Sequence, residues 1–278
     1  RIEVKVIGEY GYEQAMFGMG LSFGVTSGMN FYDFKKEIGD IHNENHISST
    51  NHSKTAKMKF VLENTASKDG GHNKFLESMQ IWLDVNAPRF WWSEADTYRV
   101  GSTKQSESTM HTLVRQLERF GKMMREECKD GMPHGTTLFE FFYGKKSMIE
   151  LSLFVKENFD VEGEETTFNG ERCLKPTSCS DDILETMLRM AFTIAHLEDG
   201  EEKLVFAKRL LPEAFMQRRI WNINYKTMRN IYLQRNGHRL PHWNMFIEQV
   251  LEQIFHPELM KFDMKAFGSY ILGKELGE

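Results

Sequence analysis

The chain has few cysteines and no long apolar run, and both absences exclude whole classes of protein. Its three cysteines, Cys128, Cys173 and Cys179, form no CxxC pair, which argues against a disulfide framework and a zinc knuckle. No apolar stretch approaches the roughly 18 residues of a membrane span, and the opening RIEVKVIGEY lacks a signal peptide's apolar centre. We therefore expect a cytoplasmic globular protein that does not enter a membrane.

Repeats, low-complexity linkers and a dinucleotide fingerprint are also absent. The chain has 278 residues, of which 40% are hydrophobic, so it can bury a substantial core in one large domain or two small ones. Without a linker or repeat, we expect a single α+β domain over residues 1–278, with mixed signals only over 144–179. The glycine-punctuated FGMGLSFGVTSG does not have GxGxxG spacing, so a dinucleotide fold fits poorly.

The pattern of apolar residues predicts a mixture of strands and helices. Strands are expected over 2–7 and 79–85, and helices over 13–21, 55–66, 110–128, 181–196 and 241–255. Ala87 and Pro88 should end the second strand. Ser180 should cap the helix predicted over 181–196. Pro241 suits the first turn of the last helix. A turn is expected at FNGER, residues 168–172.

Two polar segments read as loops. Residues 39–53 carry His42, His46 and His52 and predict an exposed loop, with a metal site as the less favoured alternative. Residues 89–111 combine aromatic side chains, two arginines and many hydroxyls. Such a loop can bind phosphate or carbonyl groups, although hydroxyl-rich segments more often cap a helix.

The most informative stretch is 210–243, which concentrates cations and amides. Between Lys203 and Arg239 there are nine Lys or Arg and one acid, Glu213, although the net charge of the chain is −5. This asymmetry points to an anionic ligand that is bound locally. A nucleic acid is an alternative, but the negative net charge and the ligand-like spacing argue against it. An ordinary solvated face with snorkelling Lys and Arg is the other alternative.

We expect this stretch to be a helix whose polar residues divide between two faces. Asn224, Ile231 and Arg235 would fall within about 40° of one another, with Asn224 and Arg235 roughly 16 Å apart along the axis. Lys226 and Asn230 would share a second face. One face could therefore touch both ends of a nucleotide-sized ligand, and a helix that is polar on most sides suggests packing between other surfaces.

Short motifs in the same order resemble the flavin-dependent thymidylate synthases. That family carries Arg, His, Arg, two variable residues and Ser after its central strand; residues 97–102 read TYRVGS here. The upstream His and Glu of the family correspond to His72 and Glu77. The family's later motif is matched at Ala207, Lys208, Leu211, Pro212, Trp221, Asn224, Lys226, Asn230 and Arg235, followed after one inserted residue by His238 and Trp243. Near the N-terminus, GLSFG with Ser22 resembles a short family element.

This resemblance implies a fold, an assembly and a reaction. The fold would be α+β, an antiparallel sheet with long helices, in a homotetramer whose active sites are built from several subunits. The reaction would move a one-carbon unit from methylenetetrahydrofolate to C5 of dUMP, giving dTMP, with FAD as cofactor and NADPH as reductant. No cysteine nucleophile is needed, and the cofactor would supply the difficult chemistry.

The resemblance also implies which residues bind the ligands. The residues that would contact FAD are Ser22, His72, Tyr98, Arg99, Asn224, Lys226, Asn230 and His238. The residues that would hold the pyrimidine nucleotide are Lys208, Gln105, Ser106, Glu107, Ser108 and Arg235. Arg235 would be catalytic, because a guanidinium beside the uracil can stabilise charge that develops during attack at C5.

The sequence departs from the family pattern in one loop. Thr97 and Tyr98 replace an Arg and a His, and Gln105 replaces a Glu. A one-residue shift would instead place Glu107 and Ser108 on the family's Glu and Ser. Losing the Arg removes a charge-assisted contact of about 1.5–3 kcal/mol. The alternatives are therefore another pyrimidine nucleotide, a different one-carbon product, or a flavin- and nucleotide-binding protein without catalysis.

Overall fold

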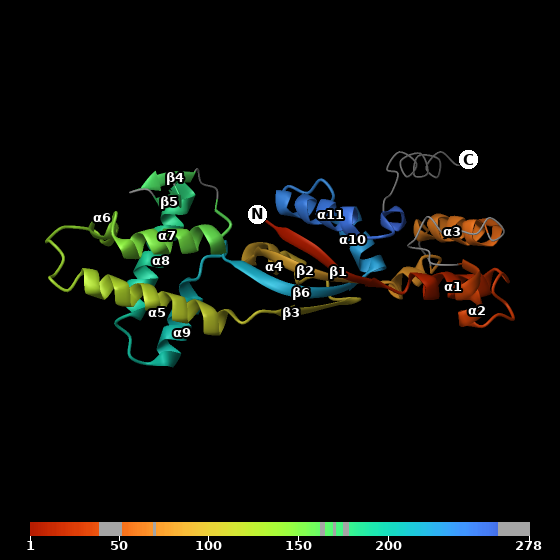
Figure 1. Cartoon of the computed structure of the whole chain (residues 1–278), viewed down its shortest axis with the longest axis horizontal. Helices are drawn as coiled ribbons and strands as arrows, with labels where there is room; N and C mark the ends of the chain where they lie inside the picture. The colour runs from red at the N-terminus through yellow and green to blue at the C-terminus, as the bar shows by residue number, and fades with distance from the viewer. Residues whose placement is uncertain (39–51, 69–70, 162–164, 169–170, 175–177, 261–278) are drawn as a thin grey trace, which may run out of the picture. The chain divides into compact units, whose positions relative to one another are not determined.

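The computed structural model describes residues 1–38, 52–68, 71–161, 165–168, 171–174 and 178–260. The chain clusters into two compact units, and each is described by itself. The helical unit comprises Arg1, Asn86–Asp96 and Ser106–Arg218, and the sheet unit comprises Ile2–Val85, Thr97–Gln105 and Arg219–Glu278. The α+β class with an antiparallel sheet is confirmed (Figure 1). The single domain over residues 1–278, with its segment of mixed signals at 144–179, stays a prediction.

Four strands form the main sheet in the order β1-β2-β6-β3. Their bounds are β1 Glu3–Tyr10, β2 Gln80–Pro88, β6 Met216–Asn224 and β3 Ser102–Ser106. The strands predicted over 2–7 and 79–85 are confirmed, and β2 ends at Pro88 as expected. Strand β2 lies inside the sheet. Its alternate residues Ile81, Leu83 and Val85 are fully buried, which accounts for their apolar side chains.

The loop predicted over 89–111 is wrong for most of its length. Residues Arg89–Ala95 form helix α4, and Ser102–Ser106 form β3. The aromatic residues of α4 serve burial, since Trp91 and Trp92 are fully buried. Strand β3 lies at the edge of the sheet and is mostly exposed, so it lacks the apolar alternation by which strands are recognised.

The other edge strand, β1, is covered by helix α11, Pro241–Gln253 (Figure 1). The carboxamide of Gln249 accepts from Val4 N–H at 2.8 Å and donates to Ile2 C=O at 3.1 Å. Gln253 repeats the pattern, accepting from Val6 N–H at 3.0 Å and donating to Val4 C=O at 2.9 Å. Four helix residues rise by about 6.0 Å, which nearly matches the roughly 6.8 Å of two strand residues, so these amides satisfy an otherwise open edge.

Short helices complete the sheet unit. They are α1 Tyr12–Ser22, α2 Phe31–Ile38, α3 His52–Ala66, η2 Lys74–Glu77, α10 Tyr225–Arg235 and η3 Pro257–Leu259. The helices predicted over 13–21, 55–66 and 241–255 are confirmed, and Pro241 stands in the first turn of α11. The predicted loop over 39–53 lies outside the described residues as far as residue 51, and α3 begins at His52.

The helical unit packs helices around one apolar core. Its elements are α5 Thr109–Glu127, α6 Leu138–Phe142, α7 Lys146–Asn158, α8 Ser178–Ile194, α9 Gly200–Leu210 and a hairpin of β4 Glu165–Phe168 with β5 Glu171–Leu174. The predicted helices over 110–128 and 181–196 are confirmed. Ser180 lies inside α8, so its prediction as a cap is wrong. The hairpin brackets the turn predicted at FNGER.

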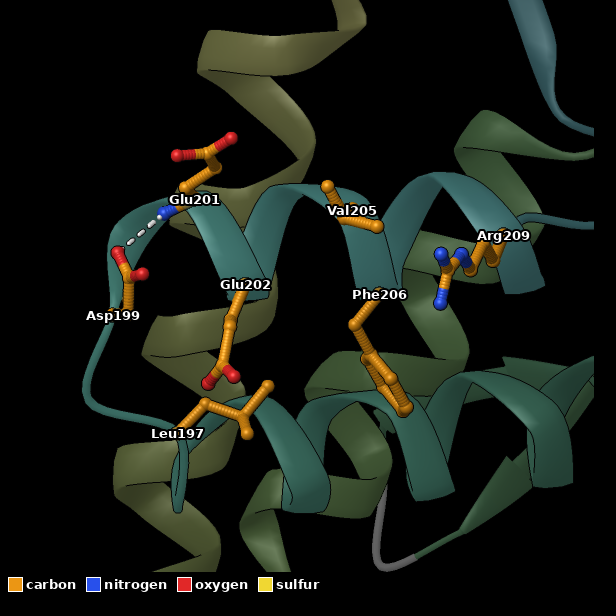
Figure 2. A pocket seen from close by; sticks show the side chains of 7 residues that line it. All are labelled: Leu197, Asp199, Glu201, Glu202, Val205, Phe206 and Arg209. Carbon is orange, nitrogen blue, oxygen red and sulfur yellow. Dashed lines mark hydrogen bonds between the residues drawn. The ribbon is translucent and has the colours of Figure 1, made fainter.

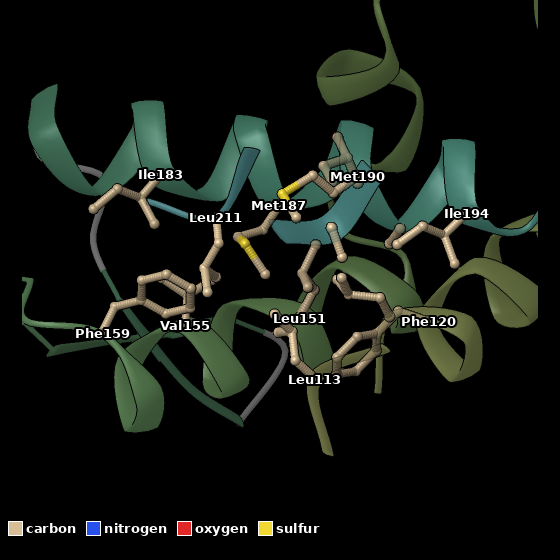
Figure 3. Packing of buried hydrophobic residues seen from close by; sticks show 14 of the residues in the cluster. Leu113, Phe120, Leu151, Val155, Phe159, Ile183, Met187, Met190, Ile194 and Leu211 are labelled. Carbon is tan, nitrogen blue, oxygen red and sulfur yellow. The ribbon is translucent and has the colours of Figure 1, made fainter. Parts of the chain in front are cut away.

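Core packing explains why Lys146–Asn158, within the segment of mixed signals, form helix α7. From α8, Ile183, Met187, Met190 and Ile194 point toward Leu151 and Val155 of α7 and toward α5 (Figure 3). Gly121 of α5 lies against α8, where an added Cβ would stand 2.4 Å from Ala191 O. None of the described helices is long and apolar enough to cross a membrane.

Candidate functional site

The cation-rich stretch 210–243 contains strand β6, helix α10 directly after it, and the start of α11. The prediction of a continuous helix is wrong, because Met216–Asn224 form β6 and α10 begins at Tyr225. Asn224 is the N-cap of α10: its side-chain oxygen accepts from Thr227 N–H at 2.8 Å. Buried Trp221 and Ile223 alternate in β6 with the half-buried Asn222, which is a strand pattern. Asn224 therefore stands at the boundary of α10, whereas Ile231 and Arg235 lie within the helix.

The loop Thr97–Gly101 is held along α10. Near the start of the helix, Asn224 N–H donates to Gly101 C=O at 2.9 Å, and the Thr227 hydroxyl donates to Val100 C=O at 2.7 Å. Gly101 has φ +62°, and a Cβ there would stand 2.1 Å from Asn224 Nδ2. Only glycine permits this close approach.

This loop, η2, β2 and α10 enclose a pocket of about 600 Å³. Five of the predicted cofactor residues line it: Tyr98, Arg99, Asn224, Lys226 and Asn230. The remaining lining residues are Glu77, Gln80, Thr97, Val100, Gly101, Thr227 and Gln234. Gln80, Thr227 and Gln234 were not predicted as site residues. Their place in the pocket depends on how β2, α10 and the loop Thr97–Gly101 pack together, which a one-dimensional pattern does not show.

One cation of the pocket is already paired. Lys226 Nζ lies 2.5 Å from a carboxylate oxygen of Glu77, and both side chains are partly exposed. The hydrogen bond from Lys226 holds the pKa of Glu77 below its ordinary value. An anionic ligand that binds Lys226 must therefore compete with the Glu77 carboxylate for its ammonium group.

Arg235 stands at the end of α10 among three aromatic or heteroaromatic rings. Its Nε donates to the Tyr98 hydroxyl at 3.0 Å, and Nη1 lies 2.9 Å from His238 Nε2. The guanidinium is 4.9 Å from the ring centroid of Trp243, a cation–π distance. The structure therefore brings together Tyr98, Arg235 and His238, three of the predicted site residues.

The other three predicted cofactor residues, Ser22, His72 and His238, do not line the pocket. Ser22 is the exposed last residue of α1, and His72 is exposed in the turn before η2. Both belong to the sheet unit.

The predicted nucleotide residues divide between the two units. Gln105 is exposed in β3 of the sheet unit, whereas Ser106, Glu107, Ser108 and Lys208 belong to the helical unit. Glu107 pairs with Arg218, donating its N–H to Arg218 C=O at 3.1 Å. Ser108 is the N-cap residue of α5, and Lys208 is exposed in the last turn of α9.

A second pocket, of about 380 Å³, lies in the helical unit beside α9 (Figure 2). Its lining is Leu197, Asp199, Glu201, Glu202, Val205, Phe206 and Arg209. Asp199 caps α9, accepting from Glu201 N–H at 2.9 Å. The acidic residues in the first turn stabilise α9 by interacting favourably with the helix dipole. This structural role accounts for them without a bound ligand.

The residues of the larger pocket fit an anionic ligand with carbonyl groups. Arg99 and Lys226 supply positive charge, and Asn230 supplies an exposed carboxamide. The helix N-terminus contributes little, because Tyr225 N–H already donates to Met79 C=O and Thr227 N–H to Asn224. Recognition therefore rests on side chains. A volume of about 600 Å³ lies within the range of small-molecule pockets, about 300–1,000 Å³.

The chain has the fold of flavin-dependent thymidylate synthases. Two structures of the Helicobacter pylori enzyme with FAD and dUMP align with TM-scores of 0.59 and 0.58 at 11% identity. The alignments cover 93% and 94% of this chain, and 98% and 100% of the other chains. A UMP/dUMP methylase from Streptomyces cacaoi bound with 5-Br UMP aligns with a TM-score of only 0.39 at 11% identity, over 84% of this chain and 75% of the other. No family model and no curated protein sequence matches the chain.

Proposed function

We propose that the protein is a flavin-dependent nucleotide methyltransferase. It transfers a one-carbon unit from methylenetetrahydrofolate to C5 of dUMP, giving dTMP, with FAD as cofactor and NADPH as reductant. The observation that carries the proposal is the convergence of Tyr98, Arg99, Lys226 and Asn230 on one pocket. The fold shared with enzymes that bind FAD and dUMP supports it.

In this proposal the larger pocket holds FAD. Lys226 and Arg99 would face its phosphates, and Asn230 would bond to its carbonyl or hydroxyl groups. Asn224 would act mainly through the cap of α10 and the loop Thr97–Gly101, since it is only 6% exposed. When bound, the flavin would supply hydride transfer, and the protein would orient it and balance its charge.

Arg235 would bind the pyrimidine nucleotide and act as the catalytic residue. A guanidinium presents several N–H donors in one plane, which match the carbonyl oxygens of uracil. When C5 attacks the one-carbon unit, charge develops on the ring, and a fixed cation beside it lowers the barrier. Trp243 would hold the guanidinium in place for this role. His238, which lies beside the guanidinium, would contact FAD.

The remaining predicted residues would complete the site through assembly. Ser22 and His72 would contact FAD, and Lys208 with the segment Gln105–Ser108 would hold the nucleotide. These residues do not line the pocket. A homotetramer would supply them from neighbouring copies, so size-exclusion chromatography with light scattering should return four times the mass of the chain.

Tritium release from 5-labelled dUMP tests the reaction. With methylenetetrahydrofolate, NADPH and FAD, the native protein should release tritium, and Arg235→Ala should lower the rate by about 10²–10³-fold. The exposed Arg239, four residues further along, provides the matched control Arg239→Ala, which should retain activity. Full activity in Arg235→Ala would refute the assignment of the catalytic residue.

The same preparation separates the alternatives. Tight binding of flavin and dUMP without tritium release would favour a binding protein, whereas release only from another labelled pyrimidine nucleotide would change the substrate. Binding to DNA or RNA that weakens steeply with salt would instead favour a nucleic-acid partner.

A further inference from the structure

Tyr98 lies in the loop where the sequence departs from the pattern of the flavin-dependent thymidylate synthases. Its hydroxyl makes two hydrogen bonds. It donates to Gln234 Oε1 at 2.9 Å and accepts from Arg235 Nε at 3.0 Å. Gln234 and Arg235 are consecutive at the end of α10. A single hydroxyl therefore connects the loop to the side chain proposed as catalytic.

The ring of Tyr98 packs against Trp243, which also lies beside the Arg235 guanidinium. Its centroid lies 5.8 Å from that of Trp243 at an interplanar angle of 71°, an edge-to-face contact. The tyrosine backbone is held as well, because Lys104 Nζ donates to Tyr98 C=O at 3.2 Å while lying 4.5 Å from the ring centroid of Trp221. Both ends of the residue are thus fixed by the sheet unit.

His238 is a weaker anchor for Arg235 than its distance suggests. Its Nδ1 accepts from Leu240 N–H at 3.1 Å, and its Nε2 faces Arg235 Nη1 at 2.9 Å. A neutral imidazole has only one accepting nitrogen, so the ring cannot satisfy both donors at once. The Tyr98 hydroxyl has no such conflict, because it can donate to Gln234 and accept from Arg235 together.

We infer that Tyr98 is a positioning residue that sets the orientation of the Arg235 guanidinium through its hydroxyl. The inference rests on the proposed role of Arg235 in nucleotide binding, and it differs from a role of the Tyr98 ring in stacking on a flavin. Removing the hydroxyl while keeping the ring distinguishes the two roles, since stacking requires only the ring.

The experiment titrates dUMP into the FAD-loaded protein by calorimetry, using Tyr98→Phe, Arg235→Ala and the double variant. Tyr98→Phe should weaken dUMP binding about tenfold, because a hydrogen bond to a charged group is lost, and should leave the FAD content unchanged. If the tyrosine acts through Arg235, the double variant should bind dUMP no more weakly than Arg235→Ala. Tyr10→Phe, which removes a hydroxyl from an exposed tyrosine, should bind like the native protein.

Three results would overturn the inference: unchanged dUMP affinity in Tyr98→Phe, losses that add in the double variant, or loss of FAD from Tyr98→Phe. If the native protein binds no dUMP, the proposed function has failed, and the inference is then decided by stability. The native protein and the same three variants are unfolded in urea. The equilibrium constants should show coupling between the two sites of at least about threefold, and additive values would refute the positioning role.

Discussion

Replacing Gly101 with alanine should damage the pocket in a way that depends on Asn224. The backbone at Gly101 has φ +62°, a conformation that costs a residue with a Cβ about 1–2 kcal/mol. The new Cβ would also stand 2.1 Å from Nδ2 and 2.6 Å from Cγ of Asn224, too close for either atom to stay. Because Asn224 is the cap of α10, displacing its side chain costs a further 0.5–2 kcal/mol or so.

The expected total is about 1.5–4 kcal/mol lost from the free energy of unfolding, measured by urea denaturation followed by tryptophan fluorescence. Gly237→Ala is the matched control, because Gly237 has φ +75° but a Cβ added there would meet nothing within 4 Å. It should lose only the conformational cost. In an Asn224→Ala background the clash is gone, so Gly101→Ala should there cost no more than the control. Equal costs of Gly101→Ala in both backgrounds would refute the reasoning.

Two further predictions concern an ion pair and a helix contact. Lys226 lowers the pKa of Glu77, so the pair should stabilise the fold above the ordinary carboxyl pKa and lose this effect as pH falls through the lowered folded value. Glu77→Gln should abolish that pH dependence of the urea midpoint, and salt should weaken it in the native protein; an unchanged profile would count against the pair. Gly121→Ala should destabilise by about 1–3 kcal/mol, because its Cβ would meet Ala191 O at 2.4 Å. Gly200→Ala, with open space around its Cβ, is the control, and equal effects of the two substitutions would show that the close approach to α8 is not limiting.

Much of the secondary structure could be predicted from periodicity, and the exceptions have physical reasons. Strand β1 and helices such as α8 bury one face, so their apolar residues recur at the expected spacing. The edge strand β3 buries almost nothing and gives no such signal. Strand β6 carries Arg218 and Arg219 and runs directly into α10, so its cations and amides resembled those of a helix.

The candidate site was only partly predictable. Asn224, Lys226 and Asn230 stand close together in sequence, and their grouping in one pocket follows from the start of α10. Glu77 and Arg99 join them from elsewhere in the chain. The resemblance implied that Arg99 takes part and matched Glu77 to a family motif, but it did not reveal the ion pair between Glu77 and Lys226.

The sequence by itself determined the α+β class, the strands β1 and β2, the longer helices such as α5, α8 and α11, and the residues on which an anionic ligand was expected. Tertiary structure alone decided that Asn224 caps a helix, that Gly101 must lack a side chain, and that Tyr98 reaches Arg235 across 137 positions of sequence. The reason is that periodicity reports which face of one element is buried. Hydrogen bonds and close approaches depend on which two elements meet, and that is settled only when the whole sheet unit packs.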